Sequence, residues 1–287
     1  MAIDYARLKA WSFPDVKQSY TGKDAILYAL GIGLGRDPVN ADELRFLYED
    51  GLAVLPTFAV ALGYPGGWLR DPKTGVDWKQ VLHGEQELHL HRPLPPEGEV
   101  VGRTRVEEII DKGAGKGALI YSSREVSDVS SGERLCTLRS TTFCRGDGGF
   151  GGPAGPTKSP HPIPEQPHEL ECDLPTSPRA ALIYRLSGDY NPLHIDPAVA
   201  RVAGFPKPIL HGLGTYGIAG HALLKTLCAY DPSRLERMDV RFSAVVFPGE
   251  TIRTEIWRTG SGKAAFRCRV LERDALVLNN GYAEYRD

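Results

Sequence analysis

Five residues between positions 189 and 212 combine the groups that proton-transfer chemistry needs. Asp189, Asn191 and His194 fall within six consecutive residues, and His211 and Gly212 follow a turn rich in glycine and proline. A carboxylate and an imidazole can exchange protons with a substrate, and a main-chain N–H can stabilise negative charge on a substrate oxygen. These residue types therefore predict a site with an acid, a base and an oxyanion donor.

The sequence around these residues predicts the elements that position them. Residues 179–186 are apolar and compatible with a helix, whereas Ser187–Pro192 contains Gly, Asp and Asn before a proline, which is typical of a turn. Asp196 before Pro197 predicts the N-cap and first position of a short helix that reaches Ala203 and ends at Gly204. The carboxylate and the first imidazole should therefore share one loop.

A longer helix is predicted directly after the His-Gly pair. Gly212, Gly214 and Gly217 open an apolar run that extends through Leu227. Glycine lets neighbouring elements pack closely, and the first N–H groups of a helix have no partner within the helix. These groups can face a ligand oxygen, and the helix dipole strengthens their effect.

Two other interpretations of the same residues involve no acid–base chemistry. In the first, Asp189 and Asn191 only form a turn, Asp196 only caps a helix, and His194 is a core histidine. In the second, the acid and the amide occupy positions one and three of a calcium-binding loop. The calcium interpretation fails because such a loop needs glycine at position six and glutamate at position twelve, where this sequence has His194 and Ala200.

The complete string favours the catalytic interpretation. SGDYNPLHIDPAVARVAGFPKPILHGL (residues 187–213) closely resembles the hydratase 2 signature of the MaoC-like family, the (R)-specific 2-enoyl-CoA hydratases. The resemblance implies that Asp189 and His194 are the catalytic pair, that Asn191 assists them and that the amide of Gly212 holds the thioester oxygen. It also implies substrate-binding positions at Gly188, His211 and Leu213.

The activity implied by the resemblance is hydration of a trans-2-enoyl-CoA to a (3R)-3-hydroxyacyl-CoA. This reaction needs a base for water, an acid for the α-carbon and a donor for the thioester oxygen. We expect Asp189 and His194 to bind one water molecule, Asn191 to orient it and the Gly212 amide to polarise the carbonyl. Either member of the pair can deliver the proton to the α-carbon. We expect no cofactor and no metal ion, and CoA enters as part of the substrate.

Three related activities stay open beside this one. A 3-hydroxyacyl-ACP dehydratase would use the same site with acyl carrier protein in place of CoA. A thioesterase is disfavoured by the signature, although thioesterases occur on the same implied fold. A non-catalytic acyl-thioester-binding hot-dog protein is the better interpretation only if the acid and the base lie apart.

Composition excludes several other classes of protein. The 287 residues include 34 basic and 36 acidic side chains, without a basic stripe that would mark a nucleic-acid surface. No apolar run approaches the roughly 20 residues that span a bilayer, and residues 1–16 resemble neither a signal peptide nor a transit peptide. The C-terminus is not a peroxisomal signal. Five scattered cysteines predict neither disulfides nor zinc, so we expect a cytoplasmic protein with no nucleic-acid or membrane partner.

A segment rich in glycine and proline divides the chain. Residues 146–168 cannot bury a core and predict a surface linker. We therefore expect an N-terminal repeat at residues 1–145, which is non-catalytic and serves the acyl chain, and a C-terminal catalytic repeat at residues 169–287.

The two halves resemble each other in sequence, which predicts two fused copies of one unit. Aligning Tyr28 with Tyr184 places Gly33, Gly35 and Pro38 where the second half has Asp189, Asn191 and His194. The first copy thus lacks an acid, an amide and a base. The chain should contain one active site.

Each half combines a helix with several strands. Runs of β-branched and aromatic residues predict strands at 86–94, 101–110, 118–129, 133–144, 237–246, 250–258, 264–272 and 275–285. The resemblance implies an α+β double hot-dog fold, in which two antiparallel sheets each wrap around a central helix. YTGKDAILYALGIG (residues 20–33) also resembles the opening of the hydratase domain of peroxisomal multifunctional enzymes. The expected assembly is a pseudo-dimeric monomer or a homodimer of double hot dogs.

Three patterns in the first half resemble features of other functional classes. His89 and His91 face one side of a predicted strand but lack a third metal ligand nearby. The glycines that begin at Gly31 fail the dinucleotide fingerprint because Arg36 stands where the last glycine belongs. The apolar stretch Leu52–Leu62, interrupted by a proline, predicts a strand or a short helix; it either packs in the core or lines the acyl-chain pocket.

Overall fold

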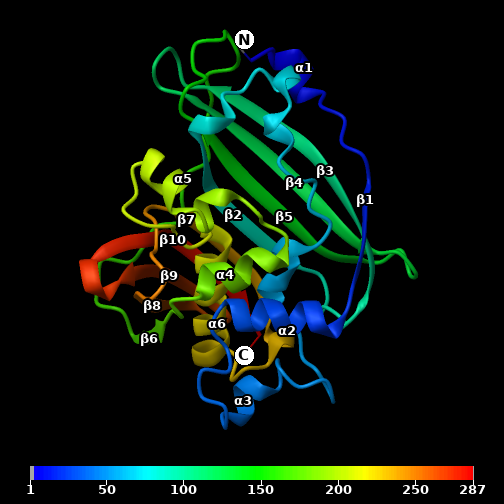
Figure 1. The fold of residues 1–287 in the computed structure, drawn as a ribbon, viewed down its shortest axis with the longest axis vertical. Coiled ribbons are helices and arrows are strands. Elements are labelled where there is room, and N and C mark those ends of the chain that lie inside the picture. The colour runs from blue at the N-terminus through cyan, green and yellow to red at the C-terminus, as the bar shows by residue number, and fades with distance from the viewer. Residues whose placement is uncertain (1–2, 287) are drawn as a thin grey trace.

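The computed structural model describes residues 3–286, which form two copies of one unit of helices and strands (Figure 1). The first copy contains α1 (Tyr5–Lys9), β1 (Val16–Tyr20), α2 (Gly22–Gly31), α3 (Ala41–Leu44), β2 (Val81–Leu90), β3 (Gly98–Asp111), β4 (Ala118–Asp128) and β5 (Arg134–Cys144). The second copy contains β6 (Leu170–Pro175), α4 (Ala180–Tyr184), α5 (Pro197–Val202), α6 (Gly212–Leu227), β7 (Leu235–Phe242), β8 (Thr251–Gly260), β9 (Lys263–Val270) and β10 (Ala275–Tyr285). In both copies, one short strand and several helices precede four longer strands.

Ten strands of the described chain form one antiparallel sheet in the order β1-β3-β4-β5-β2-β7-β10-β9-β8-β6. The copies join where β2 pairs with β7, which places Leu88 opposite Met238. From this junction outward, the strand order is β2-β5-β4-β3-β1 in the first copy and β7-β10-β9-β8-β6 in the second. In both copies, the first long strand is followed by the fourth, the third and the second, and then by the short strand. The repeat in the sequence is therefore also a repeat of topology, as in a double hot-dog fold.

The two expected antiparallel sheets are joined into one. The two sheets share an edge at β2 and β7 and are continuous. A physical reason is that an unpaired inner edge on each half would leave a row of backbone donors and acceptors without partners. Pairing these two edges satisfies both rows at once.

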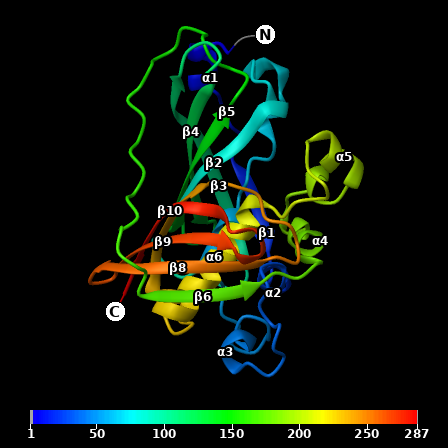
Figure 2. The same cartoon turned by 90° about the vertical axis from the view of Figure 1, so that its left-hand side faces the viewer.

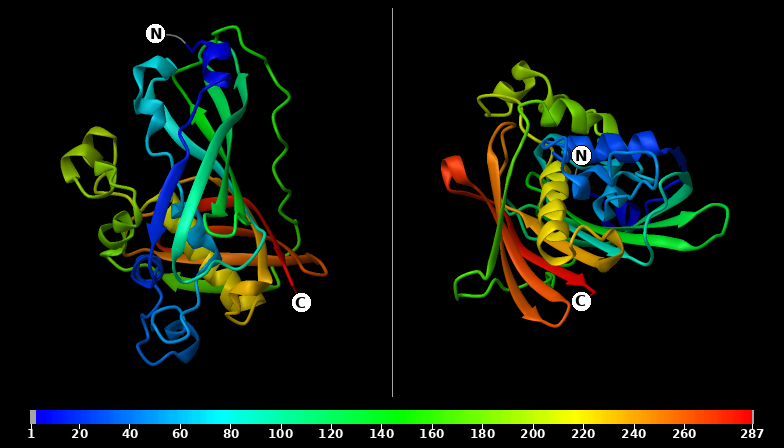
Figure 3. Two further views of the ribbon diagram at one scale, coloured as in Figure 1. Left: turned by 90° about the vertical axis from the view of Figure 1, so that its right-hand side faces the viewer. Right: turned by 90° about the horizontal axis from the view of Figure 1, so that it is seen from below.

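Helix α6 lies in the concave side of the sheet (Figure 3) and is largely buried. A Cβ atom at Gly217 would lie 2.7 Å from Ile32 Cγ2 and from the hydroxyl of Tyr28. A Cβ atom at Gly220 would lie 2.5 Å from Thr57 Cγ2. These glycines let the first copy approach the helix, so the predicted close packing is confirmed.

The first copy has no helix comparable with α6 among residues 3–146. In its place the 3-10 helix η1 (Pro56–Ala61) packs against β2, β5 and α6. The expectation of a central helix in each sheet therefore holds only for the second copy. η1 starts at Pro56 and ends after six residues, where Leu62 is extended and Gly63 has a positive φ of 58°. The short-helix and core interpretations of Leu52–Leu62 are confirmed, since most of this stretch belongs to the main hydrophobic core.

Two edge strands and two short helices were not predicted from the sequence. Strand β1 pairs with β3 at one end of the sheet, and β6 pairs with β8 at the other. Both are short. β1 lacks a clear alternation of apolar residues, and the alternation of Leu170, Cys172 and Leu174 in β6 spans only six residues, so the strand conformation of each depends on the neighbour that it joins. The short helices α1 and α3 also lie in segments for which no helix was predicted.

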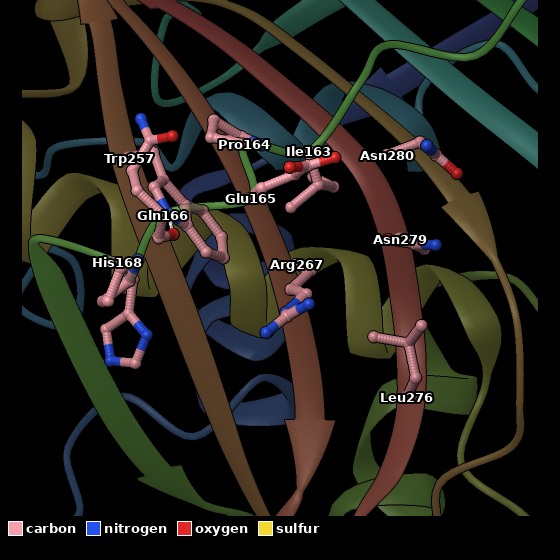
Figure 4. Close-up of a pocket in the computed structure, with 11 residues that line it drawn as sticks. Ile163, Pro164, Glu165, Gln166, His168, Trp257, Arg267, Leu276, Asn279 and Asn280 are labelled. Atoms are coloured by element: carbon pink, nitrogen blue, oxygen red, sulfur yellow. Dashed lines mark hydrogen bonds between the residues drawn. The ribbon is translucent and has the colours of Figure 1, made fainter.

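Residues 145–169 contain no helix or strand and run along the molecule as an extended strap (Figure 2). Trp257 Nε1 donates to the carbonyl of Gln166 at 2.6 Å, and Asn280 Nδ2 donates to that of His161 at 2.8 Å. The strap and strands β8–β10 line an open pocket of about 450 Å³ (Figure 4). Ile256, the neighbour of Trp257, points into the core, so this pocket lies on the face of the sheet opposite α6.

Candidate active site

Asp189 lies in the loop between α4 and α5, where tight turns orient its carboxylate. The 3-10 helix η5 (Arg185–Ser187) continues α4 and ends at Gly188, whose φ of 111° favours glycine. Asp189 Oδ1 accepts the N–H of Asn191 at 3.1 Å. The other oxygen, Oδ2, takes no part in this turn and can contact a ligand. The side chain of Asp189 is 50% exposed.

His194 follows in the 3-10 helix η6 (Pro192–His194), and one carbonyl group selects its tautomer. Its Nδ1 donates to the main-chain oxygen of Ile209 at 2.9 Å. In the neutral ring, Nε2 then carries a lone pair. Nε2 lies 4.0 Å from Asp189 Oδ2, too far for a direct hydrogen bond. Two acceptors at this separation can bind one water molecule between them.

The environment of His194 keeps its imidazole neutral. Burial lowers its pKa below the ordinary value, whereas the Ile209 carbonyl and the Asp189 carboxylate raise it and offset part of that effect. A neutral ring with a free Nε2 is the form that accepts a proton. The site therefore contains a base near Asp189.

His211 packs against the ring of His194. Its ring stacks on that of His194, with centroids 3.7 Å apart and planes inclined by 28°. Its Nε2 donates to the main-chain oxygen of Asp189 at 3.1 Å, which ties the loop to the start of α6. Burial and the neighbouring His194 lower the pKa of His211 well below its ordinary range.

Gly212 is the first residue of α6, with His211 as the N-cap. The N–H of Thr215 makes the first hydrogen bond of the helix, to the carbonyl of His211 at 3.0 Å. The amide of Gly212 precedes this bond, so it has no partner within the helix. It lies at the positive end of the helix dipole and can donate to a ligand oxygen. The site thus combines a carboxylate, a neutral imidazole and a helix N-terminus.

The structure brings the predicted acid and both histidines together. Asp189, His194 and His211 each offer an atom within 4.8 Å of the others, the one such group of three that the described chain contains. A group of this kind can hold a metal ion. Each histidine already uses one ring nitrogen to donate to a carbonyl.

The remaining predicted residues act on the site through the backbone and packing. Asn191 Oδ1 accepts the N–H of Leu193 at 3.1 Å and so caps η6; the Nδ2 amide of the side chain can orient a water molecule. Gly188 supplies the left-handed backbone conformation. Leu213 is half-buried against the main core.

Two residues beside the site belong to no motif. A Cβ atom added to Gly212 would lie 3.4 Å from the ring of Phe242, at the end of β7. Among the described residues, no other side chain beyond its two chain neighbours would lie nearer to it. His83 of β2 packs on Phe242 with ring centroids 4.7 Å apart. The pairing of β2 with β7 brings Phe242 and His83 to the site. The alternation of residues within each strand does not predict that these two strands pair.

The matching loop of the first copy serves a structural role. Tyr28 and Tyr184, the residues aligned in the two halves, pack with ring centroids 5.7 Å apart. Gly33 and Gly35 adopt positive φ angles of 97° and 76°. The N–H of Gly35 donates to Glu43 Oε2 at 2.8 Å. This loop connects helices where its counterpart holds an acid and a base.

Two family models match the chain in succession. Residues 18–146 match the MFE-2 hydratase 2 N-terminal domain, and residues 160–279 match the MaoC like domain. The chain is 40% identical to a protein named peroxisomal enoyl-CoA hydratase 2 of Arabidopsis thaliana, covering 97% of this chain and 94% of that protein. It is 41% identical to a 3-hydroxyacyl-thioester dehydratase Y of Mycobacterium tuberculosis, covering 99% of each.

Solved structures share the fold. A MaoC-like dehydratase from Phytophthora capsici superposes with a TM-score of 0.87 at 35% identity and covers 98% of this chain and 99% of that one. A Mycobacterium tuberculosis protein described as a double hot-dog fold superposes with a TM-score of 0.60 at 15% identity, which shows likeness of fold alone. The predicted double hot-dog architecture is confirmed.

Proposed function

The chain belongs to the MaoC-like hydratase 2 family, and from this premise we propose that it is an (R)-specific 2-enoyl-CoA hydratase. The enzyme adds water reversibly across the double bond of a trans-2-enoyl-CoA and forms the (3R)-3-hydroxyacyl-CoA. One observation carries the proposal: Asp189 Oδ2 and the lone pair of His194 Nε2 are 4.0 Å apart. This separation suits one water molecule, and the adjoining helix N-terminus suits the thioester oxygen.

The two acceptors bind and activate the water molecule. Water donates one hydrogen to Asp189 Oδ2 and the other to His194 Nε2, so its lone pairs are free to attack the β-carbon. As the new C–O bond forms, one O–H bond breaks and its proton passes to the pair. The Asp189–His194 pair returns one proton to the α-carbon, which completes the addition of H and OH. Asn191 Nδ2 assists by orienting the water.

The Gly212 amide stabilises the charge that develops during attack. Electrons of the double bond shift onto the thioester oxygen when water bonds to the β-carbon. A main-chain N–H at the start of α6 can donate to that oxygen, and the helix dipole favours the negative charge. When the α-carbon is protonated, these electrons return and the carbonyl is restored.

The reaction steps described above transfer only protons and a water molecule to the substrate. They include no redox cofactor and no resident metal ion, and CoA takes part as the handle of the substrate. Burial favours the neutral form of His194, which the first step requires. Asp189 remains accessible to substrate because half of its side chain is exposed.

Loss of enoyl absorbance tests the proposal directly. Purified protein mixed with crotonyl-CoA should consume the double bond, and chiral analysis should find only the (3R) product. An exclusively (3S) product, or no hydration at any chain length, contradicts the assignment. Thiol release from a saturated acyl-CoA, measured in parallel, would point to a thioesterase.

A second candidate is the dehydration of 3-hydroxyacyl thioesters on acyl carrier protein. The relative named 3-hydroxyacyl-thioester dehydratase favours it, since dehydration is the same reaction in reverse. Rates with matched CoA and acyl carrier protein thioesters separate the two. Binding of both thioesters without turnover would indicate a non-catalytic acyl-thioester-binding protein.

Location and assembly are proposals of the same kind. A cytoplasmic location is supported by five cysteines that are all buried and unpaired. Residues 3–286 include no helix that is both long and apolar enough to cross a membrane. Cell fractionation tests the location, and light scattering distinguishes a homodimer of double hot dogs from a pseudo-dimeric monomer.

A further inference from the structure

The inner face of the first-copy sheet carries a belt of polar residues between two hydrophobic clusters. On β4, Val126 belongs to the main core and Ile120 to a second cluster, while Ser122 and Arg124 lie between them on the same face. Alternate residues of a strand share a face. Strands β3, β5 and β2 belong to the same half of the sheet (Figure 1), and each of them also contributes apolar residues to both clusters.

Strand register aligns the polar residues across the sheet. Arg124 is opposite Thr104 of β3, and Ser122 is opposite Ser140 of β5. Ser140 is in turn opposite Gln86 of β2. The complete polar belt consists of His83, Gln86, Thr104, Ser122, Arg124, Ser140 and Thr142.

Part of the polar belt is satisfied within the protein. The hydroxyls of Ser122 and Ser140 lie 2.9 Å apart in a hydrogen bond. Gln86 Nε2 donates to the main-chain oxygens of Glu87 and Arg139, at 2.8 Å and 3.2 Å. Three other members are different: Arg124 Nε, Thr104 Oγ1 and His83 Nε2 are buried and lack a hydrogen-bond partner in the described structure.

Arg124 is the most unusual member because it is a buried cation. It is 9% exposed, and its Nη2 donates to the main-chain oxygen of Val60 at 2.8 Å. Its guanidinium lies over the ring of Tyr64, 5.3 Å from the centroid. Within residues 3–286, no carboxylate forms an ion pair with it. Buried charges normally have an oppositely charged partner, so this one is available to an anion that is not part of the chain.

The polar belt extends toward the proposed active site. His83 packs on Phe242, which is in turn the nearest side chain to the added Cβ of Gly212. The pKa of His83 is lowered to about 4, mainly by burial; the Asp189 carboxylate acts to raise it and Arg124 acts to lower it. His83 is therefore within electrostatic reach of both residues.

The position of Arg124 near the proposed active site bears on which acyl chains the enzyme accepts. We propose that Arg124 binds a carboxylate at the far end of the acyl chain, so that the substrates include 2-enoyl-CoAs that end in a second carboxyl group. The fork of a guanidinium matches a carboxylate with two parallel hydrogen bonds. Thr104 and His83 offer further polar contacts along the chain. This inference rests on the proposed hydratase activity and specifies its substrate class.

Matched substrates test the inference on the wild-type protein. Each pair of trans-2-enoyl-CoAs has the same length, from 6 to 14 carbons, and ends in a methyl group in one member and a carboxylate in the other. At the length that reaches Arg124, kcat/KM should be higher for the carboxylate member. Wild-type protein that hydrates crotonyl-CoA but prefers the methyl member at every length overturns the inference and leaves the hydratase function standing. Absence of hydration with every substrate contradicts the function itself.

Variants then test Arg124 itself. Arg124→Gln should lower kcat/KM for the preferred carboxylate substrate by about 10- to 100-fold, the effect of one lost charged hydrogen bond. It should leave crotonyl-CoA hydration unchanged. Arg105→Gln is the matched control, since Arg105 is exposed on the other face of β3 and pairs with Glu107. An equal loss with all substrates would mean that Arg124 holds CoA or only supports Val60, and it overturns the inference.

Discussion

The carboxylate of Glu43 and the imidazole of His221 lie 3.6 Å apart in the interior, where they join the two copies of the fold. Glu43 belongs to α3 of the first copy and His221 to α6 of the second. The hydroxyl of Tyr230 completes the group, 3.2 Å from His221 Nε2 and 3.3 Å from Glu43 Oε1. All three residues are buried, so this polar group is part of the contact between the copies.

Stability should depend on pH through His221. Burial lowers its pKa to about 4, so between pH 6.5 and 4 the unfolded chain binds a proton that the folded chain does not. Stability is therefore lost as the pH falls through this window, by about 1.4 kcal/mol per pH unit for each such histidine. Urea unfolding at several pH values should show a smaller acid loss for His221→Gln. The exposed His89→Gln serves as control and should match the wild type.

Activity should persist into mildly acidic solution. The reaction needs neutral His194, and burial lowers the pKa of this residue below 6.5. The acid limb of the kcat/KM profile should therefore fall below pH 6.5. Because the Asp189 carboxylate raises the pKa of His194, residual activity of Asp189→Asn should have its acid limb at still lower pH. An acid limb at or above pH 6.5 would show that His194 is not the base.

Substitution of the two acceptors should affect turnover most. Asp189→Asn and His194→Gln each remove one of the groups that bind water 4.0 Å apart. We expect kcat to fall by about 100-fold or more, with smaller changes in KM. Asn191→Ala should cost less, because Asn191 Oδ1 is occupied by the cap on η6. Near-normal kcat in either of the first two variants would contradict the proposed roles.

Each chain should bind one substrate productively. The loop positions aligned with Asp189, Asn191 and His194 are Gly33, Gly35 and Pro38, which carry no acid, amide or base, and Glu43 binds the N–H of Gly35. Calorimetric titration with a thioester analogue that cannot be hydrated should give a stoichiometry near one per chain. Two equivalent sites per chain would contradict the division between a catalytic and a non-catalytic copy.

Removal of metal ions should leave the activity intact. Asp189, His194 and His211 form a group that can bind a metal ion, but the proposed steps move only protons and water. Dialysis against EDTA followed by assay in metal-free buffer should preserve kcat. Restoration of a lost activity by one added divalent cation would show that these residues hold a metal in the working enzyme.

Local sequence predicted the elements next to the reactive residues well. Asp196 caps α5, Pro197 begins it, and Gly204 follows it with a φ of 87°, because capping and turn formation involve residues close in the chain. The short edge strands were not predictable in this way. β1 becomes a strand through its pairing with β3, and β3 lies about 80 residues further along the chain.

By itself, the sequence determined the chemical groups of the site: an acid, an amide and an imidazole within six residues, and a glycine at the start of a helix. Only the tertiary structure decided which nitrogen of His194 is free, because the carbonyl that binds the other nitrogen belongs to Ile209, 15 residues away. It also decided that β2 joins β7 and that Arg124 faces inward beside Thr104. Strand register depends on contacts between distant segments, so a local pattern does not determine which polar side chains meet.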